Sequence, residues 1–203
     1  MLADARPDDA VLAEEGAGRD GRTGLRWVVD PLDGTVNYLY GLPAWSVSVA
    51  VERLDGDAPV TIAAAVAHPL GHETFAAARG AGATCNGAPL AVTDPVPLEA
   101  ALVGTGFAYR TEVRRRQAAQ AAHLLPRVRD LRRLGSAALD LCYVGAGRLD
   151  GYYEDDLRRW DWLAGGLVAE EAGARVSPFA DGVVAAGPHL HTELTAELAA
   201  APA

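Results

Sequence analysis

Trp27-Val28-Val29-Asp30-Pro31-Leu32-Asp33-Gly34-Thr35 is the stretch that decides the fold. Its apolar start predicts a buried strand, and Pro31 predicts that this strand ends at Asp30, because a residue before proline avoids the helical region. Asp33 and Gly34 then predict a sharp turn or a helix start. Two carboxylates at a strand end, followed by free N–H groups near Gly34 and Thr35, offer a cation site beside a phosphate site. Asp-Pro and Asp-Gly are also ordinary turn pairs, so the rest of the chain must decide between the two interpretations.

Two further motifs favour the functional interpretation. Glu14-Glu15-Gly16 supplies an acidic pair upstream, and Trp160–Gly166 leads into Glu170–Gly173 downstream. Together with Asp30–Thr35, these segments resemble the signature motifs of the inositol monophosphatase family, in the family's order and at plausible separations. The resemblance covers the chain from about Asp8 to about Pro188. The resemblance implies that the chain is a member of a Mg²⁺-dependent, lithium-sensitive phosphatase superfamily.

The resemblance also implies an architecture. The family has a layered α/β fold (αβαβα, as in sugar phosphatases), and its site lies between two halves of the chain. We place the N-terminal α+β half, with the metal and phosphate motif, at residues 1–97. The C-terminal α/β half, with the substrate and second metal motif, is placed at 98–203, because Asp94–Pro97 is typical of a connection. Family members usually start with two more helices, so the chain is expected to be N-terminally truncated relative to them.

The order of elements follows from hydrophobic periodicity and turn residues. The predicted strands are Ala10–Ala13, Ser46–Val51, Thr61–Ala67, Glu73–Ala78, Thr84–Leu90, Ala101–Phe107, Gly151–Glu154 and Val183–Gly187. Short spacing between the early strands predicts an antiparallel meander. Helices are predicted at Arg110–Arg133, after an N-cap at Ser136, from Asp161 to Ala172, and in the Ala-rich C-terminal segment as a helix or tail.

Composition excludes several classes of function. The chain has 203 residues, a net charge of −9 and a pI near 5.0, which argues against nucleic acid as a partner. Eight arginines lie in Arg110–Arg133, and the same overall charge favours a solvated helix face there over an anion-binding patch. Two cysteines make no disulfide scaffold, and no apolar run reaches the roughly 20 residues that span a bilayer. We therefore expect a cytoplasmic protein without a membrane partner.

Candidate site residues follow from the acidic motifs. Four carboxylates gathered in one pocket cannot all stay ionised without cations, and carboxylates without a His or Cys cluster favour Mg²⁺ over zinc. The resemblance implies Glu14 and Thr35 as the catalytic residues that orient and deprotonate the attacking water. The metal ligands that it implies are Glu14, Asp30, the Leu32 carbonyl, Asp33 and Asp161, around two or three Mg²⁺ ions. The substrate-binding residues that it implies are Asp33, Gly34, Thr35, Gly135, Ser136, Ala137, Glu154 and Asp161.

These assignments predict hydrolysis of a phosphate monoester of a small polyol by metal-activated water. Gly151-Tyr152-Tyr153-Glu154 resembles the inositol-phosphatase version of its strand, which favours inositol 1-phosphate as the substrate. Histidinol phosphate, fructose 1,6-bisphosphate and adenosine 3′,5′-bisphosphate stay open within the same chemistry. A homodimer is expected from the family. The alternative from another class is a truncated, weakly active module that works by association.

Overall fold

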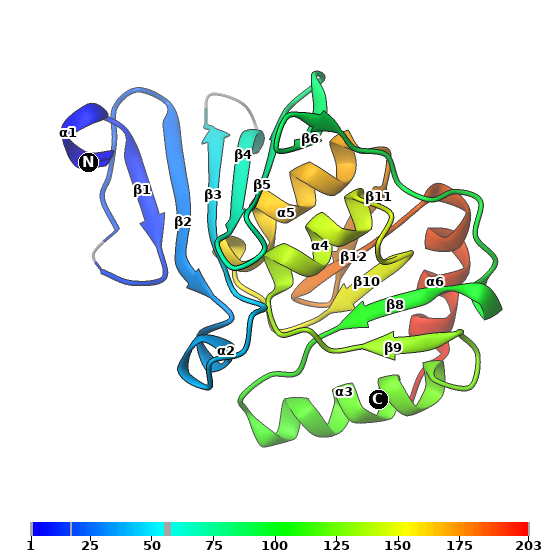
Figure 1. Ribbon diagram of the computed structural model, residues 1–203. Coiled ribbons are helices and arrows are strands. Elements are labelled where there is room, and N and C mark those ends of the chain that lie inside the picture. The colour runs from blue at the N-terminus through cyan, green and yellow to red at the C-terminus, as the bar shows by residue number, and fades with distance from the viewer. Residues whose placement is uncertain (1, 17, 55–57, 203) are drawn as a thin grey trace.

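A computed structural model describes residues 2–16, 18–54 and 58–202 (Figure 1). Its first sheet contains, in order from one edge, β1 (Ala10–Ala13), β2 (Leu25–Asp33), β3 (Ser46–Arg53), β4 (Val60–His68), β5 (Glu73–Ala78), β6 (Gly82–Cys85) and β7 (Ala88–Pro89). β1 pairs parallel to β2, and every later pair is antiparallel. The predicted meander is therefore confirmed. The strand predicted at Thr84–Leu90 is instead split by a turn at Asn86 and Gly87, which both have positive φ.

The second sheet is built from the later part of the chain. Its order is β11 (Arg175–Phe179), β12 (Gly182–Ala186), β10 (Gly151–Glu154), β8 (Leu102–Thr105) and β9 (Asp130–Arg132). β10, β8 and β9 run parallel, whereas β12 is antiparallel to both of its neighbours. The edge strand β11 is not among the predicted elements.

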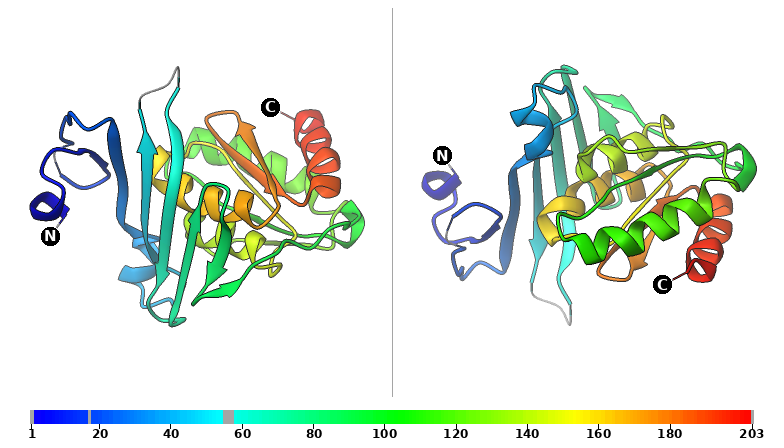
Figure 2. Two further views of the ribbon diagram at one scale, coloured as in Figure 1. Left: turned by 90° about the horizontal axis from the view of Figure 1, so that it is seen from above. Right: turned by 90° about the horizontal axis from the view of Figure 1, so that it is seen from below.

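Helices separate and cover the sheets, so the molecule is layered (Figure 2). α4 (Ala137–Gly145) and α5 (Arg159–Glu171) lie between the two sheets and share a core with β2 to β6. α3 (Thr111–Leu124) and α6 (Pro188–Ala200) cover the second sheet from its other side. The short helices are α1 (Leu2–Ala5), α2 (Thr35–Leu39) and the 3₁₀ turn η1 (Leu98–Ala100).

The side chains of β10 point alternately to the two faces of the second sheet, which explains how this sheet packs against helices on both sides. Consecutive residues of a strand point to opposite faces. Tyr152 belongs to the core with Leu141 of α4, whereas Tyr153 belongs to the core with Leu190 of α6. All four side chains are at most 2 % exposed. Burial on both faces explains the continuous apolar character of this strand.

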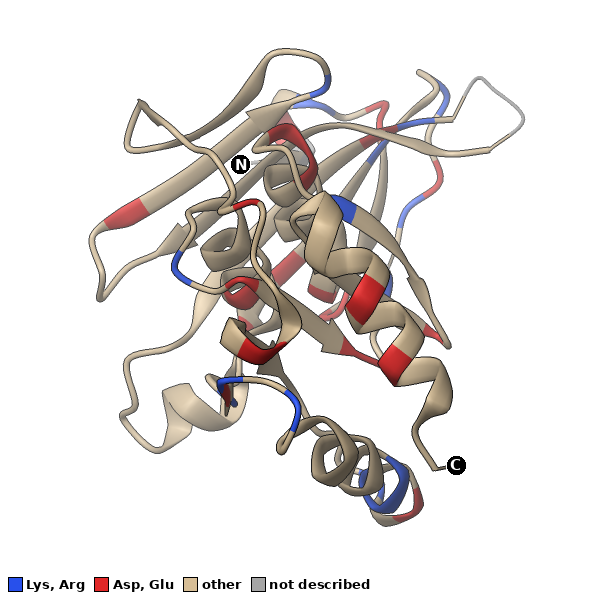
Figure 3. Ribbon diagram, turned by 90° about the vertical axis from the view of Figure 1, so that its right-hand side faces the viewer, with Lys and Arg blue, Asp and Glu red and all other residues tan. Residues whose placement is uncertain are grey.

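The helix predicted at Arg110–Arg133 ends early. α3 stops at Leu124, because Pro126 has no N–H group and cannot continue a helix. The chain then turns, and only Asp130–Arg132 of the remaining segment forms a strand, β9, which pairs in parallel with β8. Arginines are concentrated on one stretch of α3, as Figure 3 shows. Arg114 and Arg115 are exposed there, whereas Arg116 pairs with the buried Asp155 at 2.6 Å.

The proposed division at residue 97 coincides with the boundary between the sheets, but the core crosses it. Val66 and Phe75 of the first sheet share one cluster with Leu139 of α4 and Leu167 of α5. The division of the chain into two halves at residue 97 therefore stays a prediction. Within the described ranges, none of the helices has the length and apolar character needed to cross a membrane.

Candidate active site

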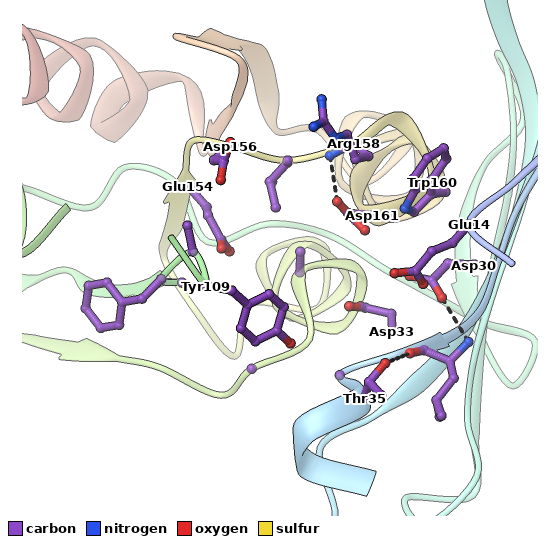
Figure 4. A pocket seen from close by; sticks show the side chains of 18 of the residues that line it. Glu14, Asp30, Asp33, Thr35, Tyr109, Glu154, Asp156, Arg158, Trp160 and Asp161 are labelled. Carbon is purple, nitrogen blue, oxygen red and sulfur yellow. Dashed lines mark hydrogen bonds between the residues drawn. The ribbon is translucent and has the colours of Figure 1, made fainter. Parts of the chain in front are cut away.

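A pocket of about 350 Å³ lies between the two sheets (Figure 4). One wall comes from the ends of β1 and β2 and the start of α2; the other comes from β10, the start of α5 and the segments after β8 and β9. The lining residues are Glu14, Asp30, Leu32, Asp33, Gly34, Thr35, Gly106, Phe107, Ala108, Tyr109, Arg133, Gly135, Ala137, Glu154, Asp156, Leu157, Arg158, Trp160 and Asp161. Ten of the eleven predicted site residues are in this set, and the exception is Ser136.

Irregular pairing in β2 brings two aspartates to the same wall. β2 continues through Pro31 to Asp33, so the predicted end at Asp30 is wrong. Asp30 pairs with Ser48 and Asp33 with Ser46, so β2 has one residue more than β3 between these pairs. Such a β-bulge restores the facing of a residue that would otherwise point away, because facing alternates along a regular strand. Both aspartates therefore face the pocket although they are three residues apart.

Asp33 ties the two halves of the chain together. Its Oδ2 atom accepts hydrogen bonds from Ser136 Oγ at 2.6 Å and from the Ala138 N–H at 2.9 Å, at the start of α4. Ser136 is the predicted N-cap, because its hydroxyl also accepts from the Leu139 N–H at 3.3 Å. Ser136 thus lies behind Asp33, where it orients that carboxylate, while its neighbours Gly135 and Ala137 reach the pocket.

The turn after Asp33 requires glycine. Gly34 has φ of 88°, and a Cβ there would lie 2.9 Å from the Ala44 carbonyl oxygen. α2 then begins at Thr35, whose hydroxyl donates to the Leu32 carbonyl at 2.9 Å. The N–H groups of Gly34 and Thr35 stand at the start of a helix, where anions are favoured.

Glu14 and Asp161 approach the aspartates from opposite sides. The Glu14 N–H donates to the Val29 carbonyl at 3.2 Å, so parallel pairing of β1 with β2 brings Glu14 next to Asp30. Asp161 is the third residue of α5, and its Oδ2 atom accepts from the Arg158 N–H at 2.6 Å. Figure 4 shows both side chains with Asp30 and Asp33 around one space.

Glu154 lines the pocket on the side away from Glu14 and Asp30. It is the last residue of β10, and its carboxyl is hydrogen-bonded to the Tyr152 hydroxyl. A Cβ at Gly106 would come within 1.9 Å of the Glu154 carboxyl, so glycine there is what leaves room for it.

The pocket carboxyls hold protons more tightly than free carboxyls do. Burial, with a smaller contribution from negative neighbours, raises the pKa of Asp161 to about 7 and that of Glu154 to about 7. Burial raises the pKa of Asp33 to about 6, against the opposing hydrogen bond from Ser136. Burial and then the charge of Asp33 raise the pKa of Asp30 well above its usual range. The pocket thus has surplus negative charge that a cation relieves.

This donor set fits a hard divalent cation. Asp30 and Asp161 each use one oxygen for a backbone N–H, and their second oxygens accept no hydrogen bond from the described residues. Over those same residues, no three Asp, Glu, His or Cys side chains are close enough to form a metal site by themselves. Mg²⁺ usually keeps several waters and takes one or two carboxylates plus substrate phosphate, so an open set of this kind suits it.

Nine of the lining residues are absent from the predicted set, and four of these, Tyr109, Arg133, Asp156 and Arg158, have a charged or hydroxyl-bearing side chain. Tyr109 and Asp156 follow the ends of β8 and β10, and Arg133 follows β9. Arg158 is the N-cap residue of α5. The position after a strand end is the only sequence signal that these residues carry, and Arg133 could not be placed while its segment was assigned to a helix.

A layered α/β fold with an acidic pocket between its sheets is the arrangement of a metal-dependent phosphatase. The sequence profile of the inositol monophosphatase family matches residues 1–202. Inositol-1-monophosphatase SuhB of Mycobacterium tuberculosis is 46% identical over 97% of this chain and 72% of its own length. Nus factor SuhB of Pasteurella multocida is 40% identical over 96% of this chain and 75% of its own length.

Solved structures agree with the profile. The inositol monophosphatase from Anabaena superimposes with a TM-score of 0.91 at 36% identity, covering 99% of this chain and 82% of that chain. The chain therefore belongs to the inositol monophosphatase family, whose members are metal-dependent phosphatases. The predicted layered α/β fold is confirmed.

Proposed function

We propose that this chain catalyses Mg²⁺-dependent hydrolysis of the phosphate monoester of a small polyol, with inositol 1-phosphate as its substrate. The observation that carries this proposal is that Glu14, Asp30, Asp33 and Asp161 line one pocket beside the N–H groups of Gly34 and Thr35. Carboxylates and helix-start N–H groups are the two kinds of ligand that phosphoryl transfer requires, because its catalysis is mainly positioning and charge stabilisation.

Each residue has a proposed task. The proposed ligands of two or three Mg²⁺ ions are the carboxylates of Glu14, Asp30, Asp33 and Asp161 and the Leu32 carbonyl. Bound Mg²⁺ neutralises phosphate charge and lowers the pKa of a coordinated water. Glu14 accepts the proton of the attacking water, and Thr35 orients that water. The N–H groups of Gly34 and Thr35 hold the phosphate oxygens.

The alcohol part of the substrate is assigned to the other wall. We propose that the hydroxyl groups of the alcohol are bound by Asp33, Ala137, Glu154 and Asp161. The adjoining part of this wall is assigned to Gly135 and Ser136. Inositol 1-phosphate is supported by the name of the M. tuberculosis relative, an inositol-1-monophosphatase. Rates of phosphate release from inositol 1-phosphate, histidinol phosphate, fructose 1,6-bisphosphate and adenosine 3′,5′-bisphosphate will rank the candidates.

Asp161→Asn tests the metal assignment. The substitution keeps an oxygen for the Arg158 N–H but removes the charge, so we expect kcat/KM to fall on the order of 100-fold while the unfolding temperature does not fall. Phosphate release is measured over a Mg²⁺ titration and in EDTA. Glu170→Gln, on the same helix but outside this pocket, is the matched control and should keep full activity. Wild-type turnover by Asp161→Asn in excess Mg²⁺ would exclude the assignment.

A second candidate function is association with another macromolecule. It is favoured by one observation: the P. multocida relative bears the name Nus factor. The homodimer expected from the family belongs to the same question, and sedimentation velocity of the purified chain tests it. Mg²⁺-dependent phosphate release separates the two candidates, since association alone requires none.

A further inference from the structure

Tyr109 presents an uncovered aromatic ring to the pocket. It lies between β8 and α3, lines the pocket and is 76% exposed. Figure 4 shows its ring projecting from this segment into the pocket, with the hydroxyl end toward the side of Asp33. Among the described residues, no hydrogen bond or ring contact engages its side chain. The ring is therefore apolar surface at the site that the described part of the chain leaves bare.

The backbone that carries this ring is held in place. Arg114 Nη1 donates to the Tyr109 carbonyl at 2.9 Å, and the Ala108 N–H donates to the Oε1 atom of the buried Gln117 at 2.8 Å. On the other side, Arg110 Nη2 lies 2.5 Å from Asp156 Oδ1. A tyrosine on a fixed backbone offers a large contact area and loses little conformational freedom when a ligand binds.

The rest of the pocket is matched to polar groups. Carboxylates and N–H groups surround the space in which the phosphate and hydroxyls of a polyol would lie. A ring such as cyclohexanehexol also has C–H groups, which form an apolar face that none of these polar groups can match. An aromatic ring attracts C–H groups through its negative face and buries them from water. An open-chain polyol has no such continuous face.

We propose that Tyr109 is a specificity-determining residue, whose ring packs on the C–H face of a cyclic polyol and favours cyclic over open-chain phosphate esters. The inference rests on the proposed phosphatase function and extends it to the shape of the alcohol. Tyr109 acts on the leaving alcohol and has no part in the transfer of the phosphoryl group.

The test compares inositol 1-phosphate with glycerol 2-phosphate, since both are esters of secondary alcohols and differ mainly in having a ring. In Tyr109→Ala, we expect the ratio of kcat/KM values, inositol 1-phosphate over glycerol 2-phosphate, to fall about three- to tenfold. The fall should lie in KM for inositol 1-phosphate, with kcat little changed. Tyr109→Phe keeps the ring and should keep the ratio. Tyr40→Ala, which removes a tyrosine that is 79% exposed but outside the pocket, is the control.

The other possible results would refute either the contact between Tyr109 and the substrate ring or the proposed phosphatase function itself. Equal loss with both esters, or no loss with either, refutes the contact; so does a Tyr109→Phe ratio as low as that of Tyr109→Ala. Because each ratio is measured on one preparation, partial unfolding cancels out. If wild type hydrolyses neither ester, the proposed function fails and this inference with it. If wild type is active and Tyr109→Ala has an unchanged ratio, only this inference fails.

Discussion

Glu52 is a charged residue with no access to solvent, and two arginines surround it. Its Oε2 atom lies 2.7 Å from Arg26 Nη2, and its Oε1 atom pairs with Arg159, the first residue of α5. The Glu52 side chain is 1% exposed, whereas the two arginines are 25% and 43% exposed. The carboxylate is thus the fully buried member of the group, and it joins β2 and β3 to the helix that carries Asp161.

Glu52→Ala should lower the free energy of unfolding by about 2–4 kcal/mol, because it leaves two guanidinium groups without their buried partner. Urea unfolding measures the change. The control is Glu170→Ala, which removes a pair with Arg79 at 3.0 Å in which both side chains are at least one-third exposed; it should cost less than about 1 kcal/mol. Equal effects of the two substitutions would show that burial of Glu52 has no special energetic weight.

Among single residues, the acidic side chains of the pocket can be predicted from the sequence, whereas the residues that surround them in the pocket cannot. Glu14, Asp30, Asp33 and Asp161 stand in short motifs that the sequence displays, and the structure gathers them in one pocket. Their catalytic roles stay a prediction. Tyr109 gives no such signal, because its place depends on how a loop runs past another strand.

Among the elements, α4 and α5 are in close contact because of one glycine. A Cβ at Gly165 would lie 2.6 Å from the Ala138 carbonyl oxygen and 2.8 Å from Leu141 Cβ. A Cβ at Gly166, the next residue, would instead lie 3.3 Å from Trp162 Cε3, which is a side-chain atom. α4 begins at the cap that orients Asp33 and α5 carries Asp161, so the spacing of these helices sets the width of the pocket.

Gly165→Ala should therefore lower the free energy of unfolding by about 1–3 kcal/mol, since overpacking outweighs the better helix propensity of alanine. Gly166→Ala adds the same methyl group one position along and should change stability by less than about 1 kcal/mol. The midpoints of urea unfolding compare the two variants. A Gly165→Ala protein as stable as wild type would mean that α4 and α5 can move apart without cost.

Strong periodicity made most strands predictable, whereas breaks in a pattern were harder to interpret. Arg110–Arg133 has apolar residues at helical spacing, and only Pro126 marks where the helix must stop and β9 must begin. At Pro31 the reverse holds: the proline predicts the end of a strand, but β2 continues through it to Asp33. Both cases depend on a neighbouring strand, which local sequence does not reveal.

For the whole molecule, the raised carboxyl pKa values couple stability to pH and to metal. Burial raises the pKa values of Asp161 and Glu154 to about 7 in the folded chain, against ordinary values of 3.8 and 4.5. Between these limits the folded state binds more protons than the unfolded state, so stability falls as pH rises. The pKa of Asp9 is instead lowered to about 2, so its opposite contribution is confined to more acidic solutions.

In EDTA, the free energy of unfolding should accordingly fall by at least about 1 kcal/mol between pH 5 and pH 8. Added Mg²⁺ should restore stability more at pH 8 than at pH 5, because protons compete with the cation for the same carboxylates. Thermal unfolding with and without Mg²⁺ measures both effects. Stability that rises from pH 5 to pH 8 in EDTA would contradict the raised pKa values.

The extra residue between Asp30 and Asp33 sets a limit on engineering this protein. Replacing Pro31 and Leu32 with strong strand formers would favour a regular hydrogen-bond ladder between β2 and β3 without the bulge. In a regular strand Asp30 and Asp33, which are three residues apart, would face opposite sides of the sheet, so one of the two carboxylates would point away from the pocket. A regular pairing of β2 with β3 is therefore incompatible with the complete cation site. Selection for thermal stability alone should favour substitutions in this segment that lower activity.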